Sequence, residues 1–92
     1  MGEVIKMSYT ILFTKQAKKD LEKVSVSNLK EKAFRLLSVL KENPYEPPLE
    51  KLTGKENVYS KRINVQHRLV YEIFETEKAV KVLRMWTHYG DN

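Results

Sequence analysis

The sequence contains no cysteine, and this absence removes disulfides and thiolate metal sites from consideration. It has only two histidines, so imidazole ligands for a metal are scarce as well. No apolar run approaches the roughly 18 residues that a membrane-spanning helix needs, and the first residues are too few and too charged for a secretion signal. We therefore expect one domain over residues 1–92 in the cytoplasm, without metal, cofactor or membrane partner, and with residues 1–7 as a frayed extension.

The sequence has fewer acidic than basic residues: 12 Asp and Glu against 17 Lys and Arg, which gives a net charge of +5. The excess predicts affinity for an anionic partner, and for a nucleic acid counterion release would supply the driving force. Charge alone is weak support, since many small basic domains bind no nucleic acid. The composition, 41% hydrophobic and 32% charged, is typical of a globular protein and argues against disorder.

Hydrophobic periodicity predicts the element order β-α-α-β-β-β, in which two helices are followed by three strands in quick succession. The expected elements cover, in chain order, residues 8–13, 15–24, 29–42, 58–64, 67–75 and 79–86. Thr14 is the expected N-cap of the first helix, and Asn28 with Glu31 resembles a capping box for the second. We therefore expect a two-layer α+β fold, with the N-terminal strand and two helices packed on an antiparallel sheet.

Alternation along the strands sorts the side chains of the last third of the chain onto two faces. In the last strand, regular alternation places Val82, Arg84 and Trp86 together, and an extended path beyond it brings His88 to the same side. One face of the sheet thus collects arginine and histidine side chains, an arrangement suited to a phosphate-binding cleft. His67 falls on the apolar face instead, which favours a structural hydrogen-bonding role for it.

Cleavage of RNA by attack of its own 2′-hydroxyl requires a base, an acid, and cations that stabilise the phosphorane. The chain offers Arg68 and Arg62 as phosphate clamps and His88 as the acid. Candidates for the base are carboxylates of the long loop that precedes the three strands: Glu46, Glu50 and Glu56. Candidates for stacking on RNA bases are three aromatic residues, of which the tryptophan is more typical of packing in the sheet: Tyr59, Trp86 and Tyr89.

Three motifs follow one another toward the C-terminus: Tyr59-Ser60-Lys61-Arg62-Ile63, Gln66-His67-Arg68-Leu69-Val70-Tyr71 and His88-Tyr89. In this combination they resemble the Txe/YoeB family of toxins in the RelE superfamily, and the resemblance runs from about Tyr9 to Tyr89. It implies a microbial-ribonuclease-like fold and an endoribonuclease that cuts mRNA on the translating ribosome. It also implies a cognate antitoxin, of the Phd/YefM or another type, that wraps the toxin, and it suggests a homodimer.

The resemblance further implies catalytic roles for individual residues. Arg68 matches the arginine that stabilises the transition state, and His88 matches the general acid. Glu50 is the best match to the general base, with Glu46 as the alternative. Because both Arg68 and His88 are retained, the sequence argues against the other reading, a non-catalytic binding module of the same fold that acts only through an antitoxin or nucleic acid.

The residues expected to bind the substrate are mostly basic. Arg62 matches a phosphate contact of the family, and Tyr89 matches the tyrosine that helps to position the substrate. Lys61 stands where the family has a first arginine, so the charge is kept but the planar fork of donors is lost. Lys51, in the same stretch as Glu50, is the fourth residue expected at the phosphate.

Overall fold

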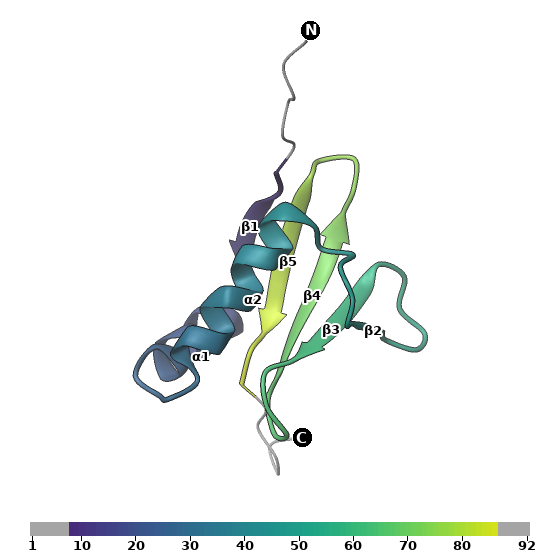
Figure 1. Cartoon of the computed structure of the whole chain (residues 1–92). Coiled ribbons are helices and arrows are strands. Elements are labelled where there is room, and N and C mark those ends of the chain that lie inside the picture. Colours follow the sequence, from purple (N-terminus) through teal and green to yellow (C-terminus); the bar gives the residue numbers. More distant parts are fainter. Residues whose placement is uncertain (1–7, 87–92) are drawn as a thin grey trace, which may run out of the picture.

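The structure of the protein, a computed structural model, describes residues 8–86 as a five-stranded sheet with two helices (Figure 1). The elements are β1 (Thr10–Phe13), α1 (Lys15–Ser25), α2 (Lys30–Glu42), β2 (Glu50–Lys51), β3 (Val58–Arg62), β4 (Arg68–Phe74) and β5 (Ala79–Arg84). The expected two-layer α+β fold is confirmed, and the predicted elements lie close to these bounds. The extension expected over residues 1–7 falls outside the described part of the chain.

The sheet is mixed, and its strand order is β1-β5-β4-β3-β2. Strands β2 to β5 are antiparallel, whereas β1 joins β5 in parallel, with Thr10 opposite Ala79. The expectation of an antiparallel sheet is therefore wrong for β1. No hairpin connects β1 to β5, so packing of the intervening helices, and not a tight turn, sets its direction. The sequence did not predict β2, because two residues are too few to show alternation.

The two helices differ in how they begin. The N-cap predicted for α1 is confirmed, since Thr14 Oγ1 accepts a hydrogen bond from the Ala17 amide at 3.0 Å. The capping box predicted for α2 is wrong: Leu29 occupies the N-cap position and no side chain caps the helix. Instead, Ser27 Oγ accepts a hydrogen bond from the Leu29 amide at 3.1 Å, so a local serine turn closes the break between the helices.

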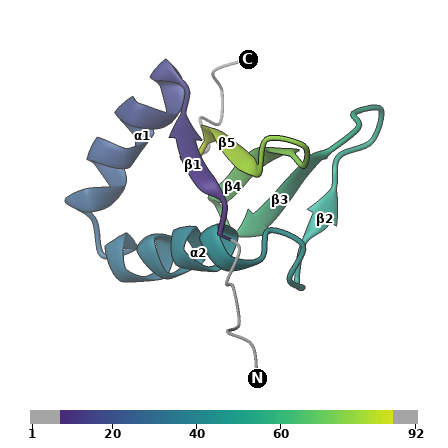
Figure 2. The same cartoon turned by 90° about the horizontal axis from the view of Figure 1, so that it is seen from above.

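Both helices lie on the same side of the sheet, as Figure 2 shows, and no helix within residues 8–86 covers the other side. The core between the layers includes Ala17, Val24, Ala33, Leu40, Leu69, Tyr71, Ile73, Val80 and Val82. In β4 the buried residues alternate with partly exposed ones, as predicted. None of the described helices is both long and apolar enough to cross a membrane.

Strand β5 departs from regular alternation at Leu83. Tyr71 of β4 pairs with Val82, but Val70 pairs with Arg84, so Leu83 is an extra residue that forms a β-bulge. Val82 is buried on the helix side, while Leu83 and Arg84 line a hollow on the uncovered side. The predicted grouping of Val82 with Arg84 is wrong, because it assumed unbroken alternation.

His67 and Trp86 pack together near the ends of their strands. The two rings are stacked, with centroids 4.1 Å apart and an angle of 25° between planes. His67 is buried, and Trp86 packs against the core. The geometry supports the structural role predicted for His67 and the packing role predicted for Trp86.

Candidate active site

Two arginines face each other across the strands that form the site. Arg62 of β3 pairs directly with Arg68 of β4, so both side chains leave the same face of the sheet. Like charges in directly opposed positions destabilise a sheet. Within residues 8–86 no carboxylate forms an ion pair with Arg62. The charge of Arg62 is therefore not balanced by a side chain within this range, and a bound anion could balance it.

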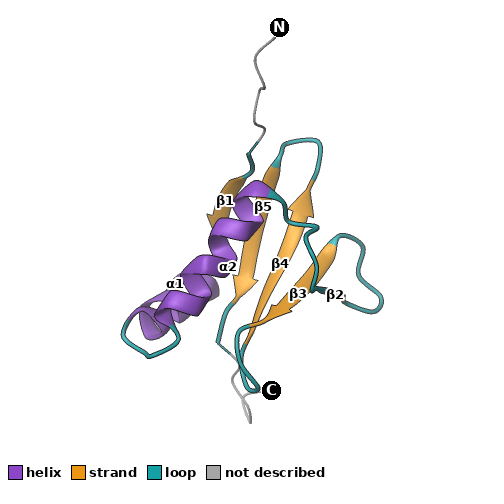
Figure 3. Cartoon of the chain, in the orientation of Figure 1, coloured by secondary structure: helices purple, strands orange, loops and turns teal. Residues whose placement is uncertain are grey.

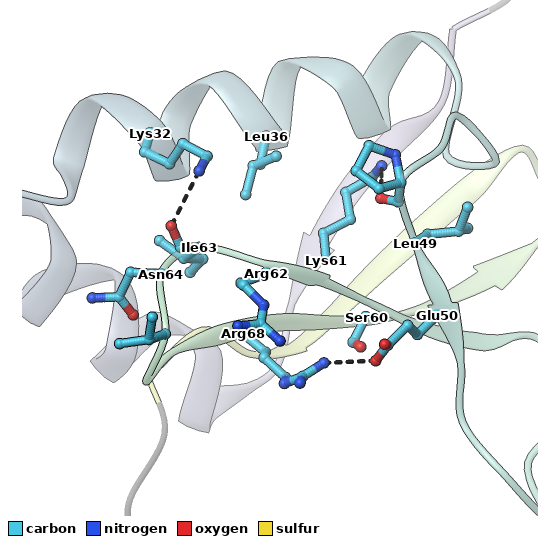
Figure 4. Close-up of a pocket in the computed structure, with 12 residues that line it drawn as sticks. Lys32, Leu36, Leu49, Glu50, Ser60, Lys61, Arg62, Ile63, Asn64 and Arg68 are labelled. Atoms are coloured by element: carbon cyan, nitrogen blue, oxygen red, sulfur yellow. Dashed lines mark hydrogen bonds and ion pairs between the residues drawn. The ribbon is translucent and has the colours of Figure 1, made fainter.

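Glu50 is the carboxylate that the fold brings to this pair. It lies in β2 opposite Ser60 of β3, and its Oε1 accepts a hydrogen bond from Arg68 NH1 at 2.7 Å (Figure 4). The Arg68 and Glu50 side chains are 41% and 69% exposed, so solvent and ligand can reach both. Of the three loop carboxylates considered from the sequence, Glu50 alone combines with the arginines. Glu56 instead lines a hollow beside β4 and β5.

The arginines and Glu50 line one cavity of about 870 Å³ at the edge of the sheet. Its other wall comes from α2, where Lys32 and Leu36 face β3 in Figure 4. The Lys32 ammonium donates a hydrogen bond to the Ile63 carbonyl at 3.2 Å and so ties the helix to the end of β3. Sequence reasoning missed both helix residues. Their signal was present, because Lys32 lies one helical turn before Leu36 beside the apolar stripe.

Lys61 lines the same cavity but is buried in its wall, and its contact with phosphate stays a prediction. Its side chain is 3% exposed, and its ammonium donates hydrogen bonds to the carbonyls of Glu46 and, at 3.1 Å, of Pro48. Burial lowers the pKa of this ammonium, and the nearby Glu46 carboxylate opposes that shift. The Tyr71 hydroxyl anchors the same loop by donating to the Pro44 carbonyl at 2.9 Å. Lys61 thus holds the loop that presents Glu50.

The remaining predicted residues lie apart from the arginine pair or outside the described chain. The Lys51 ammonium donates to the Lys55 carbonyl at 3.0 Å and lies over the Tyr59 ring at 6.0 Å, outside the cavity. The loops on either side of β2 are visible in Figure 3. His88 and Tyr89 lie outside the described residues, so their expected roles stay predictions.

Asp20 is a second residue that sequence reasoning missed. This carboxylate of α1 is fully buried, and its Oδ2 accepts hydrogen bonds from the Met85 and Trp86 amides at 3.0 and 3.2 Å. Gln16 Nε2 donates to the other oxygen at 2.9 Å. Asp20 therefore fixes the backbone that follows β5. Its signal in the sequence was an acidic residue within the apolar stripe of a helix, three positions after Ala17.

The site combines the Glu50 carboxylate with the guanidinium groups of Arg62 and Arg68 in a cavity open to solvent. Guanidinium groups hold the non-bridging oxygens of a phosphate by paired hydrogen bonds, and the carboxylate can accept a proton from a neighbouring hydroxyl. Within the described residues no group of three or more His, Cys, Asp or Glu side chains is placed to hold a metal ion. The chemistry open to these residues is proton transfer beside a bound phosphate.

Comparison with known families gives one match that spans most of the chain. A family described as the ParE toxin of the type II toxin–antitoxin system parDE matches residues 11–91. No curated protein sequence matches the chain.

Solved structures with the same fold come from several bacteria. A YoeB/ParE toxin from Agrobacterium tumefaciens is 25% identical and superposes with a TM-score of 0.77, over 87% of this chain and 99% of that one. The YoeB–YefM complex from Staphylococcus aureus is 30% identical with a TM-score of 0.74, over 88% and 98%. The DinJ–YafQ complex from Escherichia coli, 18% identical with a TM-score of 0.74 over 90% and 97%, shares the fold.

Proposed function

The chain belongs to the ParE toxin family of type II toxin–antitoxin systems, and we propose that it is an endoribonuclease that cuts messenger RNA on the ribosome. The observation that carries the proposal is the cavity in which Arg62, Arg68 and Glu50 converge. Two arginines beside one carboxylate leave a net positive charge, which matches a phosphodiester that loses a proton from its 2′-hydroxyl.

In this mechanism the Glu50 carboxylate takes the proton of the 2′-hydroxyl, and the 2′-oxygen attacks the adjacent phosphorus. The bond from phosphorus to the 5′-oxygen breaks, and His88 gives its proton to that leaving oxygen. The products are a 2′,3′-cyclic phosphate and a 5′-hydroxyl. Arg68 and Arg62 hold the non-bridging oxygens, where negative charge grows in the phosphorane.

The ion pair between Glu50 and Arg68 supports this arrangement before RNA binds. Arg68 keeps the carboxylate oriented toward the cavity, and a phosphate entering beside Arg62 would share the Arg68 guanidinium. Arg68 then neutralises the phosphate and leaves Glu50 free to accept a proton. Lys61 and Tyr71 contribute indirectly, since they fix the loop that leads into β2.

The partners in this proposal are the ribosome with its message, and a cognate antitoxin that blocks the toxin. The structure of the staphylococcal relative contains YefM, and we propose that this chain likewise has a cognate antitoxin, of that or another type. A staphylococcal YoeB dimer is also known, so a homodimer is the assembly we propose. The cytoplasm is the proposed place of action because ribosomes and messages are there.

The first prediction is that Arg68→Ala and His88→Ala each remove toxicity, with cleavage reduced at least about 100-fold, because each loses a group needed in the transition state. The measurement is growth after induction, together with mapping of new 5′ ends on one abundant message. The matched control is Arg35→Ala, which removes an exposed arginine of α2 that does not itself line the cavity. Full toxicity of either site variant would show that the role assigned to that residue is wrong.

One observation favours the alternative of a non-catalytic binding module: the Oε1 atom of Glu50 already accepts a hydrogen bond from Arg68 NH1, so this oxygen is occupied before any RNA binds. That alternative predicts growth inhibition without new 5′ ends. It also predicts that Glu50→Gln inhibits growth as strongly as the parent protein. Cuts confined to translated codons, and lost in Glu50→Gln, would decide for the nuclease.

A further inference from the structure

We propose that a second hollow, on the uncovered face of the sheet, binds the nucleotide next to the phosphate held by Arg62 and Arg68. This hollow has a volume of about 590 Å³ and is lined by residues of β3, β4 and β5, by the loop that joins β2 to β3, and by Gln16 of α1. The loop contributes Leu52, Lys55 and Glu56. The proposal rests on the proposed function, because it extends the path of the same RNA strand.

The two cavities adjoin along both strands that they share. On β3 the first cavity is lined by Ser60 and the second by Val58, and on β4 the corresponding residues are Arg68 and Val70. Ser60 and Val70 pair directly across the two strands. Each step of two residues along one face covers about 7 Å, so a chain that leaves the arginine pair reaches the second hollow within about one nucleotide.

The bulge in β5 adds Arg84 to a hollow that Lys55 also lines. Because Leu83 is the extra residue, both Leu83 and Arg84 line the hollow, and Arg84 lies directly opposite Val70. Without the bulge one of the two would point into the helix layer. The Leu83 carbonyl accepts a hydrogen bond from the Thr14 hydroxyl at 2.9 Å, so the cap of α1 fixes the bulge.

The lining of the hollow matches a nucleotide better than a bare phosphate. Three apolar side chains on neighbouring strands, Val58, Val70 and Leu83, form a floor on which the face of a base can lie. Arg84 supplies a fork for a phosphate, and Glu72 supplies a carboxylate that accepts N–H groups of a base edge. A free anion would be attracted by Arg84 and Lys55 but repelled by the carboxylates of Glu56 and Glu72.

Binding of a single-stranded RNA dodecamer, followed by fluorescence anisotropy between 50 and 200 mM salt, tests the proposal. All proteins carry His88→Ala, so that the RNA stays intact under the proposed mechanism. Arg84→Gln should weaken binding several-fold and make the plot of log K against log salt shallower by about 0.7, the contribution of one phosphate on a single strand. Arg84→Lys should restore that slope, because it keeps the charge.

The matched control is Lys81→Gln, which removes an equal charge from the same strand, three residues away and outside the hollow. It should leave the slope unchanged. The proposal is overturned by an unchanged slope in Arg84→Gln, by an equal change in Lys81→Gln, or by no RNA binding in the parent protein. Cleavage is measured separately, with the protein that keeps His88. Failure of the nuclease proposal therefore appears as absent cleavage, whereas failure of this subsite appears in the binding data.

Discussion

At the scale of single residues, Lys61 shows why a charge in a motif does not define a contact. Its place in the sequence beside Arg62 suggested a second phosphate ligand, but alternation turns neighbouring side chains to opposite faces. The Lys61 ammonium therefore meets the loop carbonyls of Glu46 and Pro48 in the wall of the cavity, while the Arg62 side chain is exposed there. A lysine suits this position because its ammonium can donate to several carbonyls at once.

Asp20 gives a prediction at the same scale. Asp20→Asn should lower the free energy of unfolding by about 2–3 kcal/mol, because an amide has one acceptor oxygen where the carboxylate uses two, one for the backbone amides and one for Gln16. Urea denaturation of the two proteins measures the difference. Glu22→Gln, an exposed change on the same helix, is the control and should stay within about 0.5 kcal/mol of the parent protein. A loss equally small in Asp20→Asn would contradict the role given to the carboxylate.

At the scale of elements, the helices and strands with a regular hydrophobic pattern could be predicted from the sequence. The stripe of α2 and the alternation of β4 identified both elements, because each buries a regular set of side chains. The bulge at Leu83 and the two-residue strand β2 have no period of their own. Yet these two irregular features place Arg84 and Glu50, so the sequence predicted the elements better than the geometry of the site.

Thr14 links two elements, which gives a prediction at this scale. Its hydroxyl donates to the Leu83 carbonyl and accepts from the Ala17 amide, so it joins the cap of α1 to the bulge of β5. Thr14→Val, which keeps the shape but removes both hydrogen bonds, should lower the free energy of unfolding by about 1–2 kcal/mol. Thermal unfolding by circular dichroism provides the measurement. Thr14→Ser retains the hydroxyl and should lose much less, and equal losses in the two variants would disprove the link.

At the scale of the whole molecule, one carboxylate joins three distant segments. Glu75, in the turn between β4 and β5, accepts hydrogen bonds from the hydroxyls of Tyr9 at 2.9 Å and Tyr45 at 2.7 Å. Lys78 pairs with its other oxygen. Hydrogen bonds from Lys78, Tyr45 and Tyr9 lower the pKa of Glu75 from 4.5 to about 2, while burial and the bond to Glu75 raise the pKa of Tyr45 to about 12.

These shifts predict how stability varies with pH. Because the pKa of Glu75 is lower in the folded state, its contribution is complete above pH 4.5 and is lost as the pH falls toward about 2. Glu75→Gln should therefore flatten the dependence of Tm on pH across that interval. Calorimetric scans at a series of pH values test this, with Glu77→Gln in the same turn as the control. A parent-like slope in Glu75→Gln would show that the cluster does not couple to folding.

The family and the fold class could be predicted because the C-terminal motifs and the element order are continuous in the sequence. The parallel pairing of β1 could not, since contact between the first and last strands leaves no local pattern. For the same reason the meeting of Glu50 with Arg68 needed the three-dimensional fold, although the family resemblance had already favoured this glutamate.

The pairing of β1 with β5 also sets an order of events during synthesis. The first strand emerges early, but its hydrogen-bonding neighbour β5 begins only at Ala79. A nascent chain therefore cannot pair β1 with β5, or form the Asp20 bonds beyond β5, until residues up to Trp86 have left the exit tunnel. Until then the edge of β1 and the Asp20 carboxylate lack these hydrogen bonds, and that interval is when a waiting partner could meet the sheet unfinished.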